Sequence, residues 1–369
     1  MKKRLGDYIK EYSVRNKENQ DIPVYSVTNT EGFCQDYFGK EVASKDKSTY
    51  KIVPQGYFAY NPSRINVGSV DWQRTQERVI VSPLYNVFSV SDKLDQQYLY
   101  YYLKSDFALQ RIKAVATGSV RDNLKLKMLY EFPINIPELS SQKNIVELLD
   151  KIKKIEGLKK AELDYFDTLV KARFVEMFEK ESDQWHHKKL VECCDNKNDI
   201  KCGPFGSQLH VEDYQNIGVP VYGIPEVNSG FKSNPKLYIS QQKAEELSAY
   251  SLIDGDVAVS RKGNVGQAAL FYDSLKNGII HSDVLRVRLN KQIMDPFFLI
   301  GELHFSQSIR NQVKQASNGA IMPGINVTKL KQIVVDIPPL AIQKEFSGFI
   351  QQVEKSKVAI QKSLDETQI

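Results

Sequence analysis

The sequence has no long apolar run and little cysteine, and each of these absences excludes a class of protein. No stretch approaches the roughly 18–20 apolar residues that a membrane-spanning helix needs. The basic start, Met1 to Asp7, is not followed by the apolar segment of a secretory signal. We therefore expect a protein of the cytoplasm with no membrane contact.

Cysteine is scarce, with four residues in a chain of 369. Cys193 and Cys194 are adjacent, which is a poor arrangement for a disulfide. Together with Cys202 and the nearby His186 and His187 they raise the alternative of a zinc site. The spacing lacks the usual Cys-x(2–4)-Cys pair, so we expect ordinary thiols and no bound metal.

Motifs for nucleotides, cofactors and catalysis are also missing. The sequence contains no Gly-x-x-x-x-Gly-Lys-Ser/Thr phosphate loop and no Gly-x-Gly-x-x-Gly that opens a helix. Asn61-Pro62-Ser63-Arg64 resembles the Asn-Pro-Pro-Tyr/Phe motif of amino-methyltransferases, but it lacks the second proline and the aromatic residue, which favours a turn. Asp254 and Asp256 ahead of Lys262 loosely resemble a nuclease set, which the first half of the chain does not repeat. A stand-alone methyltransferase or nuclease stays open only as an alternative.

Charge of one sign is not in large excess either. The 50 basic and 45 acidic residues leave a net charge of +5, which permits nucleic-acid binding on one face without requiring it. Hydrophobic residues make up 41% of the chain and charged residues 26%, as in soluble globular proteins. The length predicts two or three domains.

What the sequence does contain is a duplication with an offset of about 200 residues, far longer than a solenoid unit. The segment 134–143 (INIPELSSQK) matches the segment 335–344 (VDIPPLAIQK), and each is a short β-like run closed by proline that opens a helical pattern. Asn66-Val67-Gly68 is repeated as Asn264-Val265-Gly266. The chain is therefore expected to hold two copies of a whole domain, each followed by a helix.

Both halves show the same order of predicted elements. Apolar runs bounded by turn residues predict strands over 22–27, 50–61, 79–83 and 85–90, and over 219–224 and 251–260 in the second half. Apolar residues at helical spacing predict one helix over 95–109 and its counterpart over 297–309. Each half is thus predicted to be an α+β domain with mostly antiparallel strands.

Two long helical patterns close the halves, from about residue 141 to 179 and from about 341 to 365. Their apolar stripes include Ile145, Ile152, Phe166 and Leu169 on the first helix and Phe346 and Val353 on the second. Both helices are longer than a small domain would cover, so we expect them to pair as an antiparallel coiled coil. The alternative is that each helix lies on its own domain. A helix of about 39 residues would span roughly 58 Å.

Turns rich in Gly, Asn, Ser and Arg stand at equivalent places in both halves. Such side chains suit DNA phosphates and base edges, and the alternative is that they are merely solvated. The candidate DNA-binding residues are Arg64, Asn66, Ser69, Gly206, Ser207, Arg261, Lys262, Asn264 and Gln267.

Together these features resemble the specificity subunit of a type I restriction–modification system. The opening of its target recognition domains is similar to 202–209 (CGPFGSQL) followed by 219–230 (VPVYGIPEVNSG). The central strand and turn are similar to 255–260 with Gly263 and Gly266, and the boundary to the spacer helix is similar to 337–340 (IPPL) with Gln343. The resemblance covers the chain in the family's order of recognition domain, spacer helix, recognition domain, spacer helix.

The resemblance implies a fold and a function. Two recognition domains, 1–139 and 181–340, would be separated by antiparallel spacer helices, 140–180 and 341–369, with pseudo-two-fold symmetry. The family's subunit is not catalytic; it reads a bipartite site in double-stranded DNA and recruits two modification subunits, which bind S-adenosylmethionine and methylate adenine. A motor-nuclease subunit can join for cleavage, so Mg and ATP also belong to partners. A coiled-coil scaffold for protein interactions is the remaining alternative.

Three features depart from the family's pattern. The first half has no Gly-Pro-Phe-Gly-Ser opening, and only a polar stretch over 15–21 stands there. Its boundary has Glu138 where the second half has Pro339. The second helical pattern is shorter than the first, which is expected to weaken the helix pair or to leave a surface for partner subunits.

Overall fold

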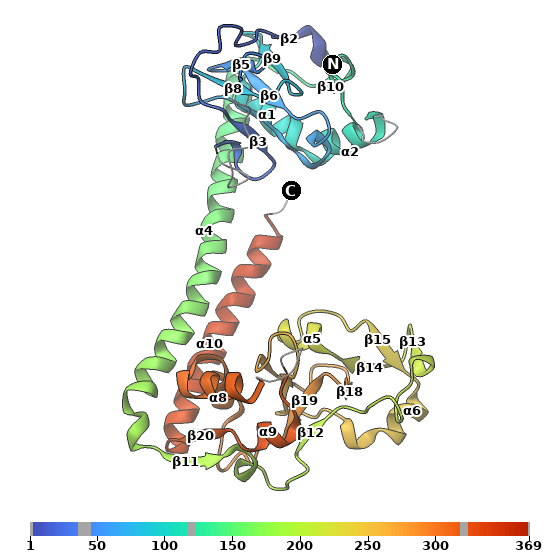
Figure 1. Ribbon diagram of the computed structural model, residues 1–369, viewed down its shortest axis with the longest axis vertical. Helices are drawn as coiled ribbons and strands as arrows, with labels where there is room; N and C mark the ends of the chain where they lie inside the picture. The colour runs from blue at the N-terminus through green and yellow to red at the C-terminus, as the bar shows by residue number, and fades with distance from the viewer. Residues whose placement is uncertain (1–2, 36–45, 117–122, 318–323, 368–369) are drawn as a thin grey trace. The chain divides into compact units, whose positions relative to one another are not determined.

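The chain folds into two units that each contain a mixed α/β head (Figure 1). The computed structural model describes residues 3–35, 46–116, 123–317 and 324–367, and the units are Met1–Ile155 and Glu156–Ile369. Head 1 comprises the residues before the long helix α4 (Leu139–Met177), and head 2 those between α4 and the final helix α10 (Leu340–Asp365). The α+β class predicted from the sequence is confirmed.

Each head is built around a four-stranded antiparallel sheet with the same strand order. In head 1 the strands, in spatial order, are β2 (Ile9–Glu11), β9 (Asn86–Val90), β6 (Phe58–Tyr60) and β7 (Val70–Trp72). In head 2 they are β12 (Ile200–Cys202), β19 (Val284–Val287), β16 (Val257–Ser260) and β17 (Ala268–Leu270). An identical order in both heads is direct structural evidence for the duplication.

The register of the two sheets matches as well as their order. Ala59 of β6 lies opposite Asp71 of β7, and Ala258 of β16 lies opposite Ala269 of β17. All residues of β6 and β16 are buried, because layers cover both faces of these strands. This is why their sequences read as continuous apolar runs rather than as alternating ones. The register also makes Asp71 the counterpart of Ala269.

Smaller sheets complete the heads, and their pairing is antiparallel with few exceptions. In head 1 they are β1 (Lys3–Arg4) with β10 (Pro133–Ile134), β3 (Ser26–Thr28) with β4 (Gly32–Cys34), and β5 (Lys51–Pro54) with β8 (Arg78–Val81). In head 2 they are β11 (His186–Lys189) with β20 (Val334–Ile337), and β13 (Tyr214–Gln215), β15 (Leu237–Ile239), β14 (Val219–Tyr222) and β18 (Ile279–Ile280). The β14–β18 pair is parallel, and so is the bridge between Val24 and Ile80 in head 1.

The helices of the heads also correspond, and they correct one prediction. Head 1 has α1 (Gln96–Lys104), α2 (Asp106–Val115) and α3 (Leu126–Tyr130), and head 2 has α7 (Pro296–Phe305), α8 (Gln307–Ser317) and α9 (Val327–Lys331). The prediction of one continuous helix over 95–109 and over 297–309 is therefore wrong. Ser105 and Ser306 adopt extended backbone angles at the breaks, and the Ser105 hydroxyl caps α2 by accepting the N–H of Ala108.

Short helices fill the connections. They are α5 (Ile224–Asn228) and α6 (Gln241–Glu246), with the 3-10 turns η1 (Leu5–Asp7), η2 (Ile65–Val67), η3 (Glu179–Gln184), η4 (Leu190–Cys193), η5 (Val211–Asp213) and η6 (Ser248–Tyr250). The element that follows residues 22–25 of head 1 differs from the one that follows their counterpart β14 in head 2. Head 1 has the β3–β4 hairpin there, and head 2 has α5.

The two long helices pair in antiparallel fashion within the second unit, as the sequence predicts (Figure 1). Lys159 near the middle of α4 donates hydrogen bonds to the hydroxyl and backbone oxygen of Ser363 at 2.8 and 3.0 Å. Arg173, closer to the end of α4, contacts Glu345 near the start of α10 at 2.9 Å. The residue numbers rise along one helix as they fall along the other, which defines the antiparallel arrangement.

A buried glutamine joins head 1 to α4. Gln142 has no exposed surface, and its side-chain oxygen accepts the backbone N–H of Asp95 at 2.8 Å. Its amide nitrogen donates to the backbone oxygens of Lys93 (2.9 Å) and Pro137 (2.8 Å). Asp95 is also the N-cap of α1, so one side chain fixes the starts of both helices.

Gln343 makes the same three hydrogen bonds in head 2. Its oxygen accepts the N–H of Asp295 at 2.9 Å, and its amide donates to the backbone oxygens of Ile293 (3.2 Å) and Pro338 (2.8 Å). Asp295 caps α7 in turn. The repeated segment in the sequence therefore encodes a duplicated junction between a head and its long helix.

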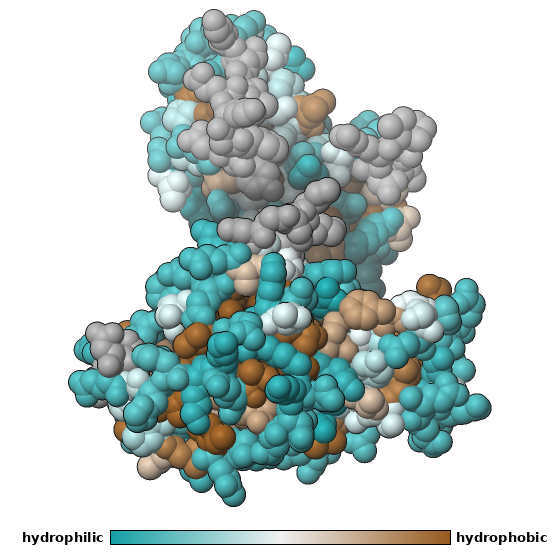
Figure 2. Space-filling view, turned by 60° about the horizontal axis from the view of Figure 1, so that its bottom comes forward, coloured by the Kyte–Doolittle hydropathy of each residue, from teal (hydrophilic) through white to brown (hydrophobic). Residues whose placement is uncertain are grey.

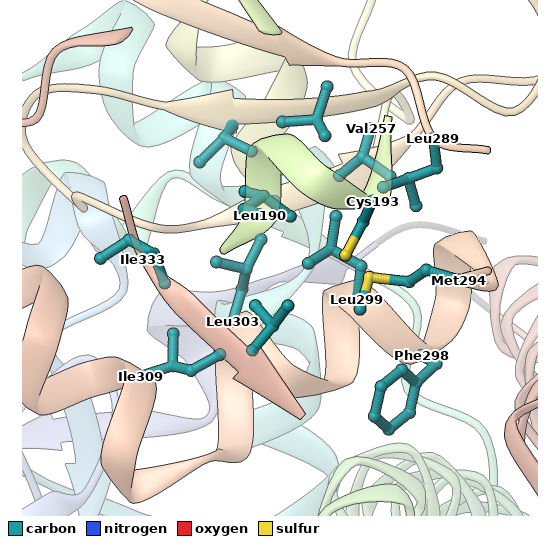
Figure 3. Close-up of a cluster of buried hydrophobic side chains, with 14 of the residues drawn as sticks. Leu190, Cys193, Val257, Leu289, Met294, Phe298, Leu299, Leu303, Ile309 and Ile333 are labelled. Atoms are coloured by element: carbon teal, nitrogen blue, oxygen red, sulfur yellow. The ribbon is translucent and has the colours of Figure 1, made fainter. Parts of the chain in front are cut away.

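The main core of the second unit combines head 2 with the ends of both long helices (Figure 3). Phe174 of α4 and Phe178 just beyond it pack on Phe298 of α7, and the rings of Phe178 and Phe298 lie 4.7 Å apart. Both also pack on Phe346 of α10. Each fully buried phenylalanine contributes about 1.5–3 kcal/mol. Head 2 is therefore anchored to the helix pair by aromatic packing.

Cys193 points into the same core, near Met294 (Figure 3). Burial raises the pKa of Cys193 to about 11 and that of Cys194 to about 12, so both remain protonated thiols at neutral pH. In the described part of the chain, no group of three or more His, Cys, Asp or Glu side chains is arranged to hold a metal ion.

The surface of the second unit is mostly hydrophilic in the view of Figure 2, with apolar residues in patches among the polar ones. Within the ranges that the structure describes, no helix combines the length and apolar character that a membrane span requires.

Candidate nucleic-acid interface

Head 1 contains an open cleft of about 820 Å³. Its walls come from residues 24–29, from the loop that follows β6 and from the turn between β8 and β9. Arg64 and Lys125 line it, and no described residue of its lining carries a carboxylate. A cleft lined by cationic but no anionic side chains has the electrostatic character that a phosphate backbone requires.

The loop after β6 is held by its own hydrogen bonds. The side-chain oxygen of Asn61 accepts the N–H of Ser63 at 3.1 Å and its hydroxyl at 2.9 Å, and the backbone oxygen of Asn61 accepts the N–H of Arg64 at 3.0 Å. Asn61 to Arg64 is therefore a turn, as predicted, and its asparagine side chain stabilises that turn. The loop presents the exposed Arg64 to the cleft.

The predicted DNA-binding residues of head 1 differ in accessibility. Ser69 lines the cleft but is only 3% exposed, whereas Asn66 is half-buried and lies outside the lining. Gly68 ends the loop with a positive φ of 88°, and Gly266 ends the equivalent loop of head 2 with a φ of 89°. The two loops are therefore structural counterparts that share the final Asn-Val-Gly, although the residues before it differ.

Three loops of head 2 lie at the ends of strands of its central sheet: residues 203–208 follow β12, 261–266 follow β16, and 281–283 precede β19. The N–H of Gly203 donates to the backbone oxygen of Val284 at 3.2 Å. A Cβ at Gly203 would lie 2.3 Å from the backbone oxygen of His281, so only glycine permits this close approach. The Gly-Pro-Phe-Gly-Ser segment is thereby held against the 281–283 turn.

Arg261 is oriented by contacts from the other two loops and from Cys202 of β12. One terminal nitrogen of its guanidinium donates to the backbone oxygen of Ser282 at 3.1 Å and contacts the sulfur of Cys202 at 3.4 Å. The guanidinium also lies 5.5 Å from the centre of the Phe205 ring, which is 52% exposed. Such a fixed, aromatic-backed guanidinium is pre-organised for a planar acceptor such as a guanine edge or a phosphate.

Lys262 stands beside Arg261 but forms an ion pair with Asp283 at 2.8 Å. Gly206, Ser207 and Asn264 are exposed on the converging loops, whereas Gln267 is half-buried at the base of its loop. The structure thus brings most of the residues predicted for the second half to one surface. This surface also carries a carboxylate, which the cleft of head 1 lacks.

Several residues of these surfaces were not singled out from the sequence. Phe205 is part of the Gly-Pro-Phe-Gly-Ser segment, so its exposed ring had a sequence signal. Asn29 and Lys125 had no such sequence signal. Asn29 follows a predicted strand over 22–27 that shows no sign of a binding site, and Lys125 resembles any surface lysine. Only the folded chain brings these two residues to the cleft of head 1.

The residues predicted for the helix pair are placed unevenly. Phe346 and Val353 are buried in the core of the second unit, and Phe166 packs against it. Ile152 and Leu169 are half-buried. Ile145 is 39% exposed in the first unit.

The titratable groups in the interior of head 2 serve structure. Burial raises the pKa of Glu302 to about 8, and the carboxylates of Asp336 and Glu179 add to this effect. Burial lowers the pKa of His304 to about 4, and its Nε2 accepts the backbone N–H of Ala268 at 3.0 Å. Both side chains are enclosed and bonded within the fold, so neither is placed for acid–base chemistry on a bound molecule.

The nuclease-like set suggested by the sequence is not assembled. Asp256 is fully buried, and its two carboxylate oxygens accept hydrogen bonds from Arg288 at 2.8 Å each. Lys262 contacts Asp283 rather than Asp254 or Asp256. The geometry therefore offers no support for a nuclease centre at these residues.

A family model for the type I restriction modification DNA specificity domain matches residues 3–165 and 183–367. The chain belongs to this family. It carries the DNA specificity domain twice, once in each head, as the duplicated sheets indicate. The family predicted from the sequence is confirmed.

Two proteins that are similar to this chain are described as specificity subunits. The putative type I restriction enzyme MjaX specificity subunit of Methanocaldococcus jannaschii is 28% identical over 156 residues, which cover 40% of this chain and 36% of the relative. The type I restriction enzyme EcoKI specificity subunit of Escherichia coli K12 is 23% identical over 292 residues, which cover 73% of this chain and 60% of the relative. The matched segments thus span less than two thirds of either relative.

Solved structures share the fold. A chain from a study of complex assembly and conformational transition of the type I R-M system aligns with a TM-score of 0.64 at 18% identity, covering 100% of this chain and 94% of that one. The S subunit of a type I restriction–modification system from M. genitalium aligns with a TM-score of 0.55 at 15% identity, covering 100% and 92%. At these identities the likeness concerns the fold.

Proposed function

We propose that this chain is the non-catalytic DNA specificity subunit of a type I restriction–modification complex, in which each head reads one half of a bipartite site. The observation that carries the proposal is the duplication itself. Two heads share sheet order, register and helix junction, yet they differ in the loops and in the surfaces around them. Two different half-sites would require a common scaffold with different reading surfaces.

The reading surfaces are the cleft of head 1 and the converging loops of head 2. In head 1, Arg64 would contact the phosphate backbone from the cleft rim. In head 2, Arg261 would contact a base edge or a phosphate, with Gly206 and Ser207 offering backbone and hydroxyl groups to phosphates. Lys262 and Asn264 would extend that surface. Ser69 and Gln267 fit better as supports of their loops, because their side chains are buried or half-buried.

The long helices would hold the heads along the duplex and bind the modification subunits. Two such subunits would match the two heads, and S-adenosylmethionine would bind to them rather than to this chain. Mg and ATP would belong to a motor-nuclease subunit. The four-part division at 139, 180 and 340 stays a prediction, although the helix limits at Leu139, Met177 and Leu340 lie close to those boundaries.

The proposal is tested by co-expressing the chain with the modification subunit of the proposed complex and mapping methylated adenines by long-read sequencing. We expect methylation at one bipartite motif. Replacing residues 181–340 with a different recognition domain should change one half of that motif and leave the other half intact. Absence of any bipartite motif, or a change in both halves, would contradict the proposal.

A further inference from the structure

We propose that the β3–β4 hairpin of head 1 is the element that sets the base preference of that head, and that Asp71 is the positioning residue that fixes the hairpin against the cleft. This inference rests on the proposed DNA-reading function. It goes further by assigning specificity to one element that is absent from the other head.

The hairpin forms one wall of the cleft. Residues 24–29, which include all of β3, line it without interruption. Ser26 is half-buried and Asn29, at the tip, is exposed. Hydroxyl and amide groups of this kind hydrogen-bond to base edges, and the asparagine amide is suited to adenine. The opposite wall carries Arg64. A contact between Arg64 and a phosphate would position the DNA without distinguishing one base from another.

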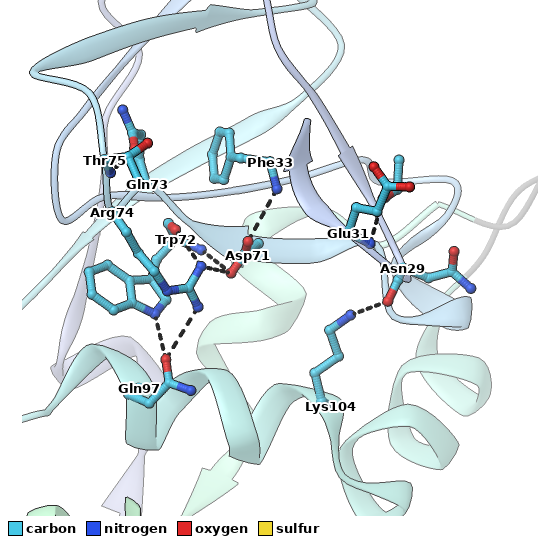
Figure 4. A network of polar contacts seen from close by, with 11 residues as sticks. Asn29, Glu31, Phe33, Asp71, Trp72, Gln73, Arg74, Thr75, Gln97 and Lys104 are labelled. Carbon is cyan, nitrogen blue, oxygen red and sulfur yellow. Dashed lines mark hydrogen bonds and ion pairs between the residues drawn. The ribbon is translucent and has the colours of Figure 1, made fainter. Parts of the chain in front are cut away.

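Asp71, which does not line the cleft, anchors the hairpin through its carboxylate (Figure 4). Its carboxylate accepts the backbone N–H of Phe33 in β4 at 3.2 Å and the N–H of Trp72 at 2.8 Å. It also forms an ion pair with Arg74 at 2.8 Å, and its side chain is only 5% exposed. A buried charge is tolerated when it is paired and hydrogen-bonded in this way.

The rest of the network locks the anchor in place. Gln97 of α1 accepts hydrogen bonds from the indole of Trp72 at 3.1 Å and from Arg74 at 3.2 Å, and the guanidinium of Arg74 lies 4.5 Å from the Trp72 ring centre. Lys104 of α1 donates to the backbone oxygen of Asn29 at 2.8 Å. The hairpin is thus tied at β4 and at its tip to the scaffold of head 1 (Figure 4).

Gly32 shows how closely the hairpin approaches its anchor. It has a positive φ of 68°, and a Cβ there would lie 1.9 Å from an oxygen of Asp71. No other residue type could occupy this position without moving the hairpin or the carboxylate. Gly32 does not line the cleft. Its substitution would therefore displace the reading edge without changing any group on it.

Head 2 has different residues and a different element at the positions equivalent to Asp71 and the hairpin. The counterpart of Asp71 is Ala269, and α5 takes the place of the hairpin and packs on β16 and β17. The common fold therefore requires neither the hairpin nor a carboxylate at this position. The β3–β4 hairpin is therefore not needed for the common fold, yet a buried ion pair holds it in place. This is best explained by a role of its cleft-lining edge in binding DNA.

The test uses the complex of the chain with its modification subunit and the methylated motif of the wild type, with the half read by head 1 assigned by the exchange of residues 181–340. Five variants are compared: Asn29→Ala at the tip, Gly32→Ala, Asp71→Ala and the conservative Asp71→Asn at the anchor, and Glu31→Ala as the control. Glu31 is exposed on the same hairpin but does not line the cleft. The readout is the fraction of methylated sites that carry one wrong base, counted separately for the half read by head 1 and the half read by head 2.

We expect Asn29→Ala, Gly32→Ala and Asp71→Ala to raise methylation at sites with a wrong base in the head 1 half by about tenfold, which is at the lower end of what one mismatched base pair costs. Discrimination in the head 2 half and the Glu31→Ala variant should stay as in the wild type. Asp71→Asn, which keeps an acceptor for Phe33, should recover part of the specificity.

Two results would overturn the inference. Unchanged specificity in Asn29→Ala and Gly32→Ala would remove the hairpin from base reading, even if Asp71→Ala failed to fold. An equal loss of discrimination in both halves would mean that the variants act on stability alone. If the wild type methylated no bipartite motif, the proposed function would fail first, and this inference with it.

Discussion

Head 1 and head 2 share one scaffold but differ in the elements that surround it. The shared elements indicate what the fold requires, and the differing elements indicate what each head uses for recognition. Sheet order, central-strand register, helix order and the glutamine junction are the same in both. The hairpin of head 1 and the short helix α5 of head 2 are not. Because the shared parts include nearly all of the buried core strands, the scaffold can be kept while the reading surface changes.

The heads also differ in how they meet their long helices. In head 2, α7 packs against aromatic side chains of both α4 and α10. In head 1, the equivalent helix α1 is rich in tyrosine and bonds to the polar side of α4, where Tyr101 contacts Asp150. The junction of head 2 is therefore apolar around its glutamine, whereas the junction of head 1 is amphipathic. The following predictions test how far the equivalence of the heads extends.

Removal of the junction glutamines is expected to have the largest effect. Gln142→Ala and Gln343→Ala each leave one backbone N–H and two backbone oxygens without partners in a buried site. An orphaned buried group costs about 1–3 kcal/mol, so each variant should lower the unfolding free energy of its own head by about 3 kcal/mol. Glutamine to glutamate is a poor control, because it would bury a charge; Lys143→Ala and Lys344→Ala, at the exposed neighbouring positions, are the matched controls.

The two tryptophans make this measurement possible head by head. Trp72 reports on head 1 and Trp185, which donates to the backbone oxygen of Phe178, reports on the junction of head 2. Denaturant unfolding followed by fluorescence in Trp72→Phe and Trp185→Phe backgrounds should assign each loss to one head. A similar loss in both heads from either single variant would show that the junctions are coupled rather than independent.

Exchange of the residues at the equivalent helix position should have the next largest effect. Gly301 of α7 corresponds to Tyr101 of α1, and a Cβ at Gly301 would lie 2.8 Å from Phe174 and 2.9 Å from Phe346. Gly301→Tyr should therefore cost about 2–3 kcal/mol by overpacking the aromatic core. Tyr101→Gly should cost only about 1 kcal/mol, the price of glycine in a helix. Equal costs in thermal unfolding would contradict the contrast between the junctions.

A third prediction concerns pH, and it distinguishes the heads because Glu302 of head 2 corresponds to Tyr102 of head 1. Burial raises the pKa of Glu302 from 4.5 to about 8 and that of Tyr102 to about 12. The folded state therefore holds the Glu302 proton at pH values where the unfolded state has released it. Its contribution to stability falls as pH rises from about 4.5 to about 8 and stays low above that range.

Relative to the wild type, Glu302→Gln should therefore become progressively more stable as pH rises. We expect the difference in unfolding free energy between pH 5.5 and pH 8.5 to exceed about 1.4 kcal/mol, the equivalent of one pKa unit. Tyr102→Phe in head 1 should show no change over the same interval. Parallel pH profiles for wild type and Glu302→Gln would show that the carboxyl is already ionised in the folded protein.

The contrast between the heads also marks what the sequence could and could not reveal. Duplication, long helices and most strands were predictable, because apolar periodicity and turn residues are local signals. The break at Ser105 was not, since extended backbone angles there interrupt a continuous apolar pattern and the serine hydroxyl caps the next helix. The β3–β4 hairpin was missed because the residue that anchors it, Asp71, lies some forty positions further along the chain.

The candidate site was predictable in part for a similar physical reason. Residue type and repeat position identified Arg64 and Arg261, which the fold does place on surfaces. Accessibility was not encoded in the same way, so Ser69 was chosen although it is buried. The pairing of Lys262 with Asp283 joins positions on separate loops, and only the convergence of those loops brings the charges together.

That pairing leads to the prediction with the smallest effect. Arg64→Gln and Lys262→Gln should each weaken DNA binding by the complex with its modification subunit on all sequences alike, and lower the salt slope by about one. The effect of Lys262→Gln should be the smaller one, because Lys262 must leave Asp283 before it binds a phosphate. The lining of the head 1 cleft offers Arg64 no such carboxylate within the described residues.

Asp283→Asn provides the matched control for this difference. It frees Lys262 and removes a negative charge from the surface, so affinity should rise and the salt slope should steepen in fluorescence-anisotropy titrations. The double variant Lys262→Gln with Asp283→Asn should then lie between the two single variants. If Asp283→Asn weakens binding instead, Asp283 itself contacts the DNA, as an acceptor for cytosine would, and the carboxylate of head 2 would belong to base reading rather than to the restraint of its lysine.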